Sequence, residues 1–129
     1  MAIVITRSES QLAATGAFAA LDNLGTASVS SSFTVPTNVS AIKQIAIAVT
    51  ADGSDEFVPL IKISGNTMRD GDAVFGAGGQ TAMPSSTGSN MMYVSIDTDL
   101  KVQPGNSVSY EIATTQVATI DCIVTCQFA

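Results

Sequence analysis

The chain has 129 residues, the length of one ordinary domain, and only 12% of them are charged. A soluble helical domain usually carries many more Glu, Lys and Arg on its exposed faces, so this composition favours strands joined by turns. The net charge is −6, and the basic residues are scattered along the sequence: Arg7, Lys43, Lys62, Arg69 and Lys101. Because nucleic-acid binders need clustered Lys and Arg to neutralise phosphates, we expect no direct contact with nucleic acid.

No segment of the sequence predicts export or membrane insertion. Residues 1–7 lack the basic region and apolar stretch of a secretory signal. Residues 12–21 are too few, and too rich in Ala, Thr and Gly, to span a bilayer. We therefore expect synthesis in a host cytoplasm, with no signal peptide and no membrane partner.

The first 26 residues carry the weakest pattern. Residues 2–6 are β-prone, and Ser8 could cap a short helix that runs to about Ala20. A turn is predicted at residues 22–25. The whole chain is predicted to be one β-sandwich domain, with residues 1–26 as an N-terminal arm or first strand and residues 27–129 as the main sandwich.

Strand patterns become clear after this point. Residues 29–35 alternate between apolar and polar, and Pro36 ends the run. In the next strand Ile45, Ile47 and Val49 share one face. Both segments predict strands that bury one face.

The middle of the chain is less regular. Residues 57–63 predict a strand in which Pro59 indicates an edge position or a bulge, and Gly65 ends that strand. Residues 72–75 form a short β-like segment. Residues 76–90 are dominated by Gly, Ser, Thr and Ala, so they predict a long loop.

The last part of the chain has the cleanest alternation. Residues 92–97 and 108–112 predict strands, separated by a Pro-Gly turn at residues 103–106. Residues 118–128 predict the final strand. In total about eight short strands are expected, which favours a sandwich or barrel, and both jelly-roll and immunoglobulin-like strand orders remain open.

The two cysteines, Cys122 and Cys126, are predicted to lie on the apolar face of the last strand. Residues four apart on a strand are about 13 Å from each other, whereas a disulfide needs Cα atoms within about 7 Å. The chain has no histidine to complete a zinc site. We therefore expect both cysteines to act as small core hydrophobes.

The missing histidine also excludes Ser-His-Asp and Cys-His catalysis. A general base would have to be a carboxylate, lysine or tyrosine. The acidic candidates are Asp52, Asp55, Glu56, Asp70, Asp72, Asp97, Asp99, Glu111 and Asp121. Their spacing matches no hydrolytic pattern, so we expect no catalytic residues and no enzyme, with a carboxylate-based hydrolase as a minor alternative.

Two acidic turns are the remaining ligand candidates. Asp52, Asp55, Asp70 and Asp72 could supply oxygens to calcium, but neither turn has the spacing of a helix-loop-helix calcium motif. We expect solvated turns, with no metal and no cofactor, and keep calcium as the alternative. The glycine-rich residues 75–79 lack the lysine of a phosphate loop and predict a turn.

Residues 34–49, 61–66, 70–71 and 102–106 together resemble the strand-and-turn pattern of small jelly-roll proteins that build or decorate virus capsids. The resemblance covers most of residues 27–129. It implies an eight-stranded antiparallel jelly roll that assembles through symmetric copies. Because this chain lacks a basic arm, a position in the shell or on its outer surface is favoured over contact with a genome.

Two functions follow from these observations. The first is a virion structural protein, a capsid shell, cement or decoration subunit that forms homo-oligomers and contacts other capsid proteins. The alternative is a ligand- or carbohydrate-binding β-sandwich module assisted by calcium. Sugar sites usually stack on exposed aromatics, and the chain has no Trp and only Tyr93 and Tyr110 as tyrosines.

Overall fold

The structure is a computed structural model that describes residues 2–21, 32–53, 59–65, 73–76, 86–115 and 118–129. Every regular element in these ranges is a β-strand, and the described residues contain no helix long and apolar enough to cross a membrane. In chain order the strands are β1 (Ile3–Ala14), β2 (Ala19–Ala20), β3 (Phe33–Thr34), β4 (Ala41–Gly53), β5 (Pro59–Ser64), β6 (Ala73–Gly76), β7 (Ser86–Lys101), β8 (Ser107–Thr114) and β9 (Ala118–Phe128).

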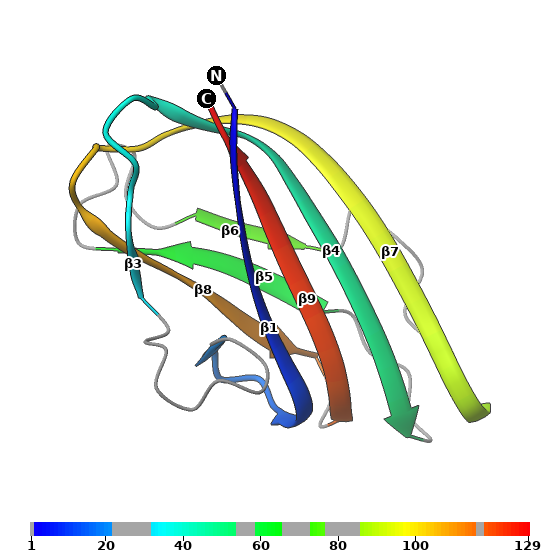
Figure 1. The fold of residues 1–129 in the computed structure, drawn as a ribbon. Helices are drawn as coiled ribbons and strands as arrows, with labels where there is room; N and C mark the ends of the chain where they lie inside the picture. The colour runs from blue at the N-terminus through cyan, green and yellow to red at the C-terminus, as the bar shows by residue number, and fades with distance from the viewer. Residues whose placement is uncertain (1, 22–31, 54–58, 66–72, 77–85, 116–117) are drawn as a thin grey trace.

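The strands pair in a nested order, as if one long hairpin had been rolled up. β1 pairs with β9, β2 and β3 pair with β8, β4 pairs with β7, and β5 pairs with β6, all antiparallel. Two further pairings, β4 with β9 and β5 with β8, complete two sheets. Figure 1 shows the sheet β1-β9-β4-β7 in front of the sheet formed by β8, β5 and β6.

This nested order is that of a jelly roll. β2 and β3 pair with successive parts of β8, so they are two pieces of one strand position, and the described strands fill eight positions. The fold predicted from the sequence, an eight-stranded antiparallel jelly-roll sandwich, is therefore confirmed. We call β1-β9-β4-β7 sheet A and β2-β8-β5-β6, with β3, sheet B.

The core lies between the two sheets and follows the predicted alternation. On β4, Ile45, Ile47 and Val49 are buried, as are Ile61 and Ile63 on β5 of the opposite sheet. On β9 the buried side chains are Ile120, Cys122, Val124, Cys126 and Phe128. β4 and β9 of one sheet thus turn their buried side chains towards β5 of the other, so the strands with the clearest period of two form the core.

The turn between β7 and β8 has the predicted geometry. Gly105 has a φ of 85°, and the Asn106 N–H donates to the Gln103 carbonyl at 3.3 Å. A type II turn needs a positive φ at its third residue and favours proline at its second, as Pro104 and Gly105 provide. The Gly105 N–H also donates to the Val35 carbonyl at 3.0 Å, so this turn is tied to the segment after β3.

The helix predicted for residues 8–20 is wrong. Residues 3–14 form β1, whose pairing with β9 continues to Ala14 across a bulge between Glu9 and Leu12. Ala, Gln and Leu favour helices locally, but the backbone hydrogen bonds offered by β9 outweigh that preference. β2 follows at residues 19–20 after a bend, and the turn predicted at residues 22–25 lies outside the described residues.

Two further predictions need correction. Pro59 indicated an edge strand or bulge, but β5 lies between β6 and β8. Pro59 is tolerated there because it is the first residue of the strand and its register partner is Thr114 of β8, whereas the pairing with β6 begins at Leu60. The predicted loop at residues 76–90 is too long, because β7 begins at Ser86 and pairs with β4.

Candidate interaction surface

One face of sheet A packs on the core, and the other points to solvent. We call the second the outer face, and its rows follow from the strand registers. Its side chains are Val4, Thr6, Ser8 and Ser10 of β1; Asp121, Ile123, Thr125 and Gln127 of β9; Gln44, Ala46, Ala48 and Thr50 of β4; and Tyr93, Ser95 and Asp97 of β7. Most of these side chains are small and uncharged.

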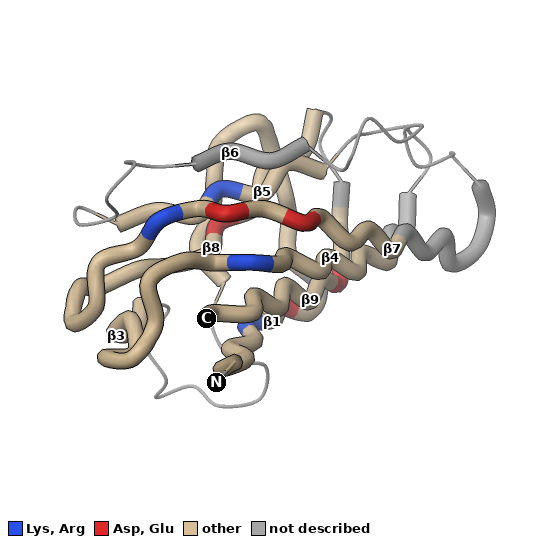
Figure 2. The backbone as a smooth tube through the Cα atoms, turned by 90° about the horizontal axis from the view of Figure 1, so that it is seen from above, with Lys and Arg blue, Asp and Glu red and all other residues tan. Residues whose placement is uncertain are grey.

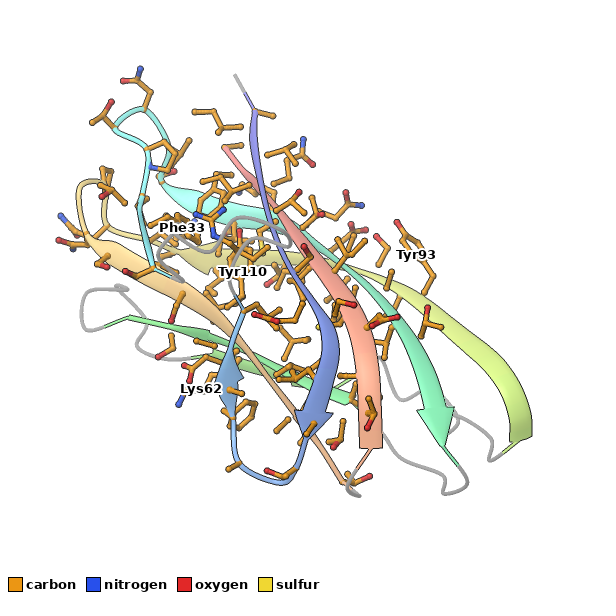
Figure 3. All side chains as sticks on the ribbon, turned by 60° about the horizontal axis from the view of Figure 1, so that its bottom comes forward. Phe33, Lys62, Tyr93 and Tyr110 are labelled. Atoms are coloured by element: carbon orange, nitrogen blue, oxygen red, sulfur yellow. The ribbon has the colours of Figure 1, made fainter. Side chains whose placement is uncertain are left out.

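Three large hydrophobic side chains are exposed on the outer face. Val4, Tyr93 and Ile123 are 59%, 67% and 49% exposed, and they are the exposed large hydrophobics among the described residues. Ile123 and Tyr93 lie in one row with Ala48 between them. Figure 3 shows Tyr93 on β7, apart from Phe33 and Tyr110. Exposed apolar side chains gathered on one face are typical of an interaction surface.

A hollow of about 280 Å³ lies at the part of the outer face next to the β1 bulge. Its lining residues are Ser8, Glu9, Ser10, Ala48, Thr50, Asp121, Cys122 and Ile123. The Ser10 hydroxyl donates to the Asp121 carboxylate at 3.2 Å. The hollow therefore offers hydroxyl and carboxylate groups beside the apolar Ile123.

A small charge cluster lies at the other end of the outer face. Lys43 of β4 and Lys101 of β7 both donate to the Asp99 carboxylate, Lys101 at 2.7 Å. The hydrogen bond from Lys101, followed by that from Lys43, lowers the pKa of Asp99 to about 2. Figure 2 shows the Lys and Asp positions along β4 and β7, where most other positions hold uncharged residues.

The other described basic residues lie apart from this cluster. Lys62 of β5 lies 4.0 Å from the Glu111 carboxylate of β8 and 5.3 Å from the centre of the Phe18 ring. Arg7 stacks 5.0 Å from the centre of the Phe33 ring. Lys43 and Lys101, which lie far apart in the sequence, are brought together by the register at one acid, Asp99. That pair does not make a phosphate-binding surface, because Asp99 lies between the two charges.

The interior beneath the outer face is aromatic and closely packed. Tyr110 of β8 is fully buried, and its hydroxyl donates to the Ile5 carbonyl of β1 at 3.0 Å. The Phe33 ring meets the Tyr110 ring edge-on at 5.2 Å and the Phe128 ring at 6.0 Å. This cluster joins sheet B to sheet A and supports β1 and β9 from within.

Both cysteines belong to this interior. Cys122 and Cys126 are buried and free of disulfides, as the sequence predicted. Burial raises the pKa of Cys122 and of Cys126 to about 12. Their thiolates, the reactive forms, are therefore scarce at neutral pH.

The ligand sites predicted from the sequence fall largely outside the described residues. Asp55, Asp70 and Asp72 lie there, and only the backbone of Asp52, in β4, is described. The calcium hypothesis therefore stays a prediction. Tyr110 is buried and so cannot stack on a sugar, which leaves the exposed Tyr93 as the candidate tyrosine for sugar stacking.

Tyr93 and Ile123 were not predicted to be contact residues, although the sequence carries a signal for both. Tyr93 alternates in phase with the polar Ser95 and Asp97, opposite to the apolar phase of β7. Ile123 likewise shares the phase of Asp121 and Thr125 on β9. A large apolar residue in the polar phase of a strand is a usable sign of a contact surface.

Comparisons with known proteins give matches among solved structures. No family model and no curated protein matches the sequence. A chain in the structure of infectious bursal disease virus, strain Gx, is 15% identical with a TM-score of 0.59, and the match covers 98% of this chain and 32% of the viral chain. The globular domain of zebrafish complement 1qA protein is 15% identical with a TM-score of 0.50, and the match covers 97% of this chain and 94% of that domain.

At such identities the likeness is one of fold. The chain spans about a third of the viral chain that it matches, and nearly all of the complement domain. The fold-level resemblance to virus capsid proteins is therefore confirmed, together with a likeness to a complement domain.

Proposed function

We propose that the chain is a structural subunit of a virus particle, a shell, cement or decoration subunit that acts by self-assembly and not by catalysis. The observation that carries the proposal is the outer face of sheet A. It is a broad, nearly uncharged strand surface on which Ile123, Ala48 and Tyr93 form an apolar row.

The chemistry of this face suits protein contact. Burying small neutral side chains requires no desolvation of ions, and exposed tyrosine and isoleucine are side chains that interfaces use as anchors. The charged residues of the face lie at its ends, where an interface tolerates them as a rim.

The fold comparison supports the same proposal. This chain shares its fold with about a third of the matched chain of infectious bursal disease virus, strain Gx. Fold alone does not assign a role. We propose a location in a virion, with copies of this chain and other capsid proteins as partners. Both parts of this proposal therefore rest on the outer face as well as on the fold.

Catalysis is not part of the proposal. The chain has no histidine, and the hollow beside the β1 bulge offers two carboxylates, Glu9 and Asp121, of which Asp121 already accepts a hydrogen bond from Ser10. The Ser10 hydroxyl and the Asp121 carboxylate form a nucleophile-and-base pair in the hollow, and the proposal assigns this pair no catalytic role.

The test is the association state of the purified chain. Sedimentation analysis over a wide concentration range, with electron microscopy of concentrated samples, is expected to give symmetric oligomers or particles. Ile123→Ser should weaken association at least several-fold, whereas Thr119→Ser, on the same strand, should leave it unchanged. A chain that remains monomeric at high concentration and binds no capsid would contradict the proposal.

A ligand-binding module is the second candidate, because of the hollow. Its volume, about 280 Å³, is close to the lower limit of ligand pockets, and its lining is partly polar. A glycan-array screen with and without calcium tests this candidate. Binding that Asp121→Ala abolishes, in a chain that stays monomeric, would favour the module over the assembly subunit.

A further inference from the structure

Sheet A has two open edges. Among the described residues β1 pairs only with β9 on that sheet, and β7 pairs only with β4. Within the described ranges the outer edge of each strand has no neighbouring strand, so the backbone N–H and C=O groups of that edge take no part in sheet pairing. Such an edge is a template for pairing with another chain unless the sequence blocks it.

The β1 edge carries two blocking features. Arg7 and Glu9 are register partners of the buried Val124 and Cys122, so these charges belong to the inward phase of β1. A bulge then interrupts the register between Glu9 and Leu12. Inward-pointing charges and bulges are the devices with which natural sheets prevent edge-to-edge pairing.

The β7 edge lacks these features in its middle, because the register shifts between β4 and β7 lie on either side of it, between Asp97 and Leu100 and between Ser86 and Asn90. Residues 86–96 contain no charge, and residues 91–96 contain neither Pro nor Gly. The register with β4 is continuous from Asn90 to Asp97. The three charges of β7 are confined to its last five residues: Asp97, Asp99 and Lys101.

We propose that β7 pairs antiparallel with β7 of a second copy of this chain, about a two-fold axis at Tyr93 or Val94 in the middle of the strand. This inference rests on the proposed self-assembly and names the edge that performs it. The two copies of sheet A then form one continuous sheet, in the order β1-β9-β4-β7-β7-β4-β9-β1.

The charges along β7 favour this arrangement. Antiparallel pairing about the middle of the strand places Asp97 opposite Ser89 or Met91 of the second copy, so the charged end of each strand meets the uncharged half of the other. A parallel arrangement would place Asp97 beside Asp97. Like charges directly opposite destabilise a strand pair, so the charges of β7 favour the antiparallel pair over the in-register parallel one.

The two-fold arrangement also uses the outer face. An axis perpendicular to the sheet keeps both outer faces on the same side, so the apolar row of Ile123, Ala48 and Tyr93 continues into the second copy. The dimer would present a surface twice as long as that of one chain, with the two exposed Tyr93 side chains near its centre.

The experiment compares the two edges of sheet A in the full chain. Tyr93→Lys/Ser95→Lys places lysines on the exposed outer side of β7, and Ala2→Lys/Ala13→Lys places them on exposed positions near the two ends of β1, outside the outer face. Each double variant changes the net charge from −6 to −4, because each substitution adds one positive charge. Because the net charge changes equally in the two double variants, the general repulsion between chains falls equally in both. Any difference in association between the two variants therefore comes from the strand that carries the lysines.

Sedimentation equilibrium should give a dimer dissociation constant that rises about tenfold or more for the β7 variant and changes less than about twofold for the β1 variant. A short bis-maleimide should crosslink Tyr93→Cys, but not Val4→Cys, into dimers. The unmodified chain is the blank, because Cys122 and Cys126 are buried.

The outcomes separate this inference from the proposed function. If the unmodified chain assembles, and the two lysine variants assemble as well as it does or weaken alike, β7 pairing is overturned and self-assembly stands. Crosslinking of Val4→Cys instead of Tyr93→Cys would also overturn it. A chain that is monomeric at every concentration, without crosslinks, would overturn both.

Discussion

The two faces of sheet A come from the same four strands but carry different chemistry. Phe128, Cys122 and Val124 point inward from β9 and are buried, whereas Ile123, Thr125 and Asp121 alternate with them and face outward. Because neighbouring residues serve opposite faces, the fold depends on one set of side chains and association can depend on the other. Stability and assembly should therefore respond to different substitutions on the same strand.

The largest difference is expected between Phe128→Ala and Ile123→Ala. Phe128 is fully buried and meets the Phe33 ring, so its truncation should cost about 3–5 kcal/mol of unfolding free energy. Ile123 is half exposed, so its truncation should cost only about 0.5 kcal/mol or less. Urea denaturation followed by far-UV circular dichroism measures both, and equal losses would refute the separation of the two faces.

Cys122→Ser tests polarity on the inner face. A hydroxyl at this buried position is expected to cost about 1–3 kcal/mol, because the thiol that it replaces behaves as a hydrophobe. The reverse exchange on the outer face, Ser95→Cys, should change stability by less than about 0.5 kcal/mol.

A thiol reagent gives a second readout for the same pair of substitutions. At neutral pH it should label one thiol in native Ser95→Cys and none in the unmodified chain, because the pKa of each native cysteine is raised to about 12. Rapid labelling of the unmodified folded chain would show that this part of the core is open.

A smaller effect is expected from Tyr110→Phe. The substitution removes the hydroxyl that donates to the Ile5 carbonyl at 3.0 Å, while the ring and its contact with Phe33 remain. Loss of this hydrogen bond should cost about 0.5–1.5 kcal/mol, whereas Tyr93→Phe on the outer face should leave the unfolding midpoint unchanged. The same denaturation measurement applies, and a larger loss for Tyr93→Phe would reverse the assignment of the two tyrosines.

The smallest effect concerns the charge cluster at the end of the outer face. The pKa of Asp99 falls from an ordinary value of 3.8 to about 2 in the folded chain, so its contribution to stability is present above pH 3.8 and is lost as the pH falls towards 2. The effect is small because water screens these exposed groups. Carboxyl NMR titration of the unmodified chain and of Lys43→Met/Lys101→Met measures it.

In the lysine double variant the pKa of Asp99 should return towards 3.8. Asp99→Asn should remove this part of the acid dependence of stability. An unchanged pKa in the double variant would mean that the two lysines do not hold the carboxylate in solution.

Local pattern was sufficient to predict much of the fold. Ile45, Ile47 and Val49 marked β4, and Pro104 with Gly105 marked the turn, because burial and backbone conformation act there on neighbouring residues. β1 was mistaken for a helix because its strand conformation depends on pairing with β9, and the residues of β1 alone do not indicate that partner. The central position of β5 was missed for the same reason.

The outer face was harder to predict than the core. Ile123 and Tyr93 stand in the polar phase of their strands, but the exposure of that phase is settled only once sheet B covers the other one, so neither residue was predicted to be a contact residue. The meeting of Lys43 and Lys101 at Asp99 depends on the register between β4 and β7, which distant residues set.

The nested pairing also governs how the chain reaches this structure. Ile3 is the register partner of Phe128, and β9 fills the position between β1 and β4. Contacts between residues so far apart in sequence make folding slow, because a long loop must close before the contacts form. During synthesis β1 and the facing edge of β4 cannot complete their pairing until β9 has been made, so the inner face of sheet A is completed only after residues 118–128 are available.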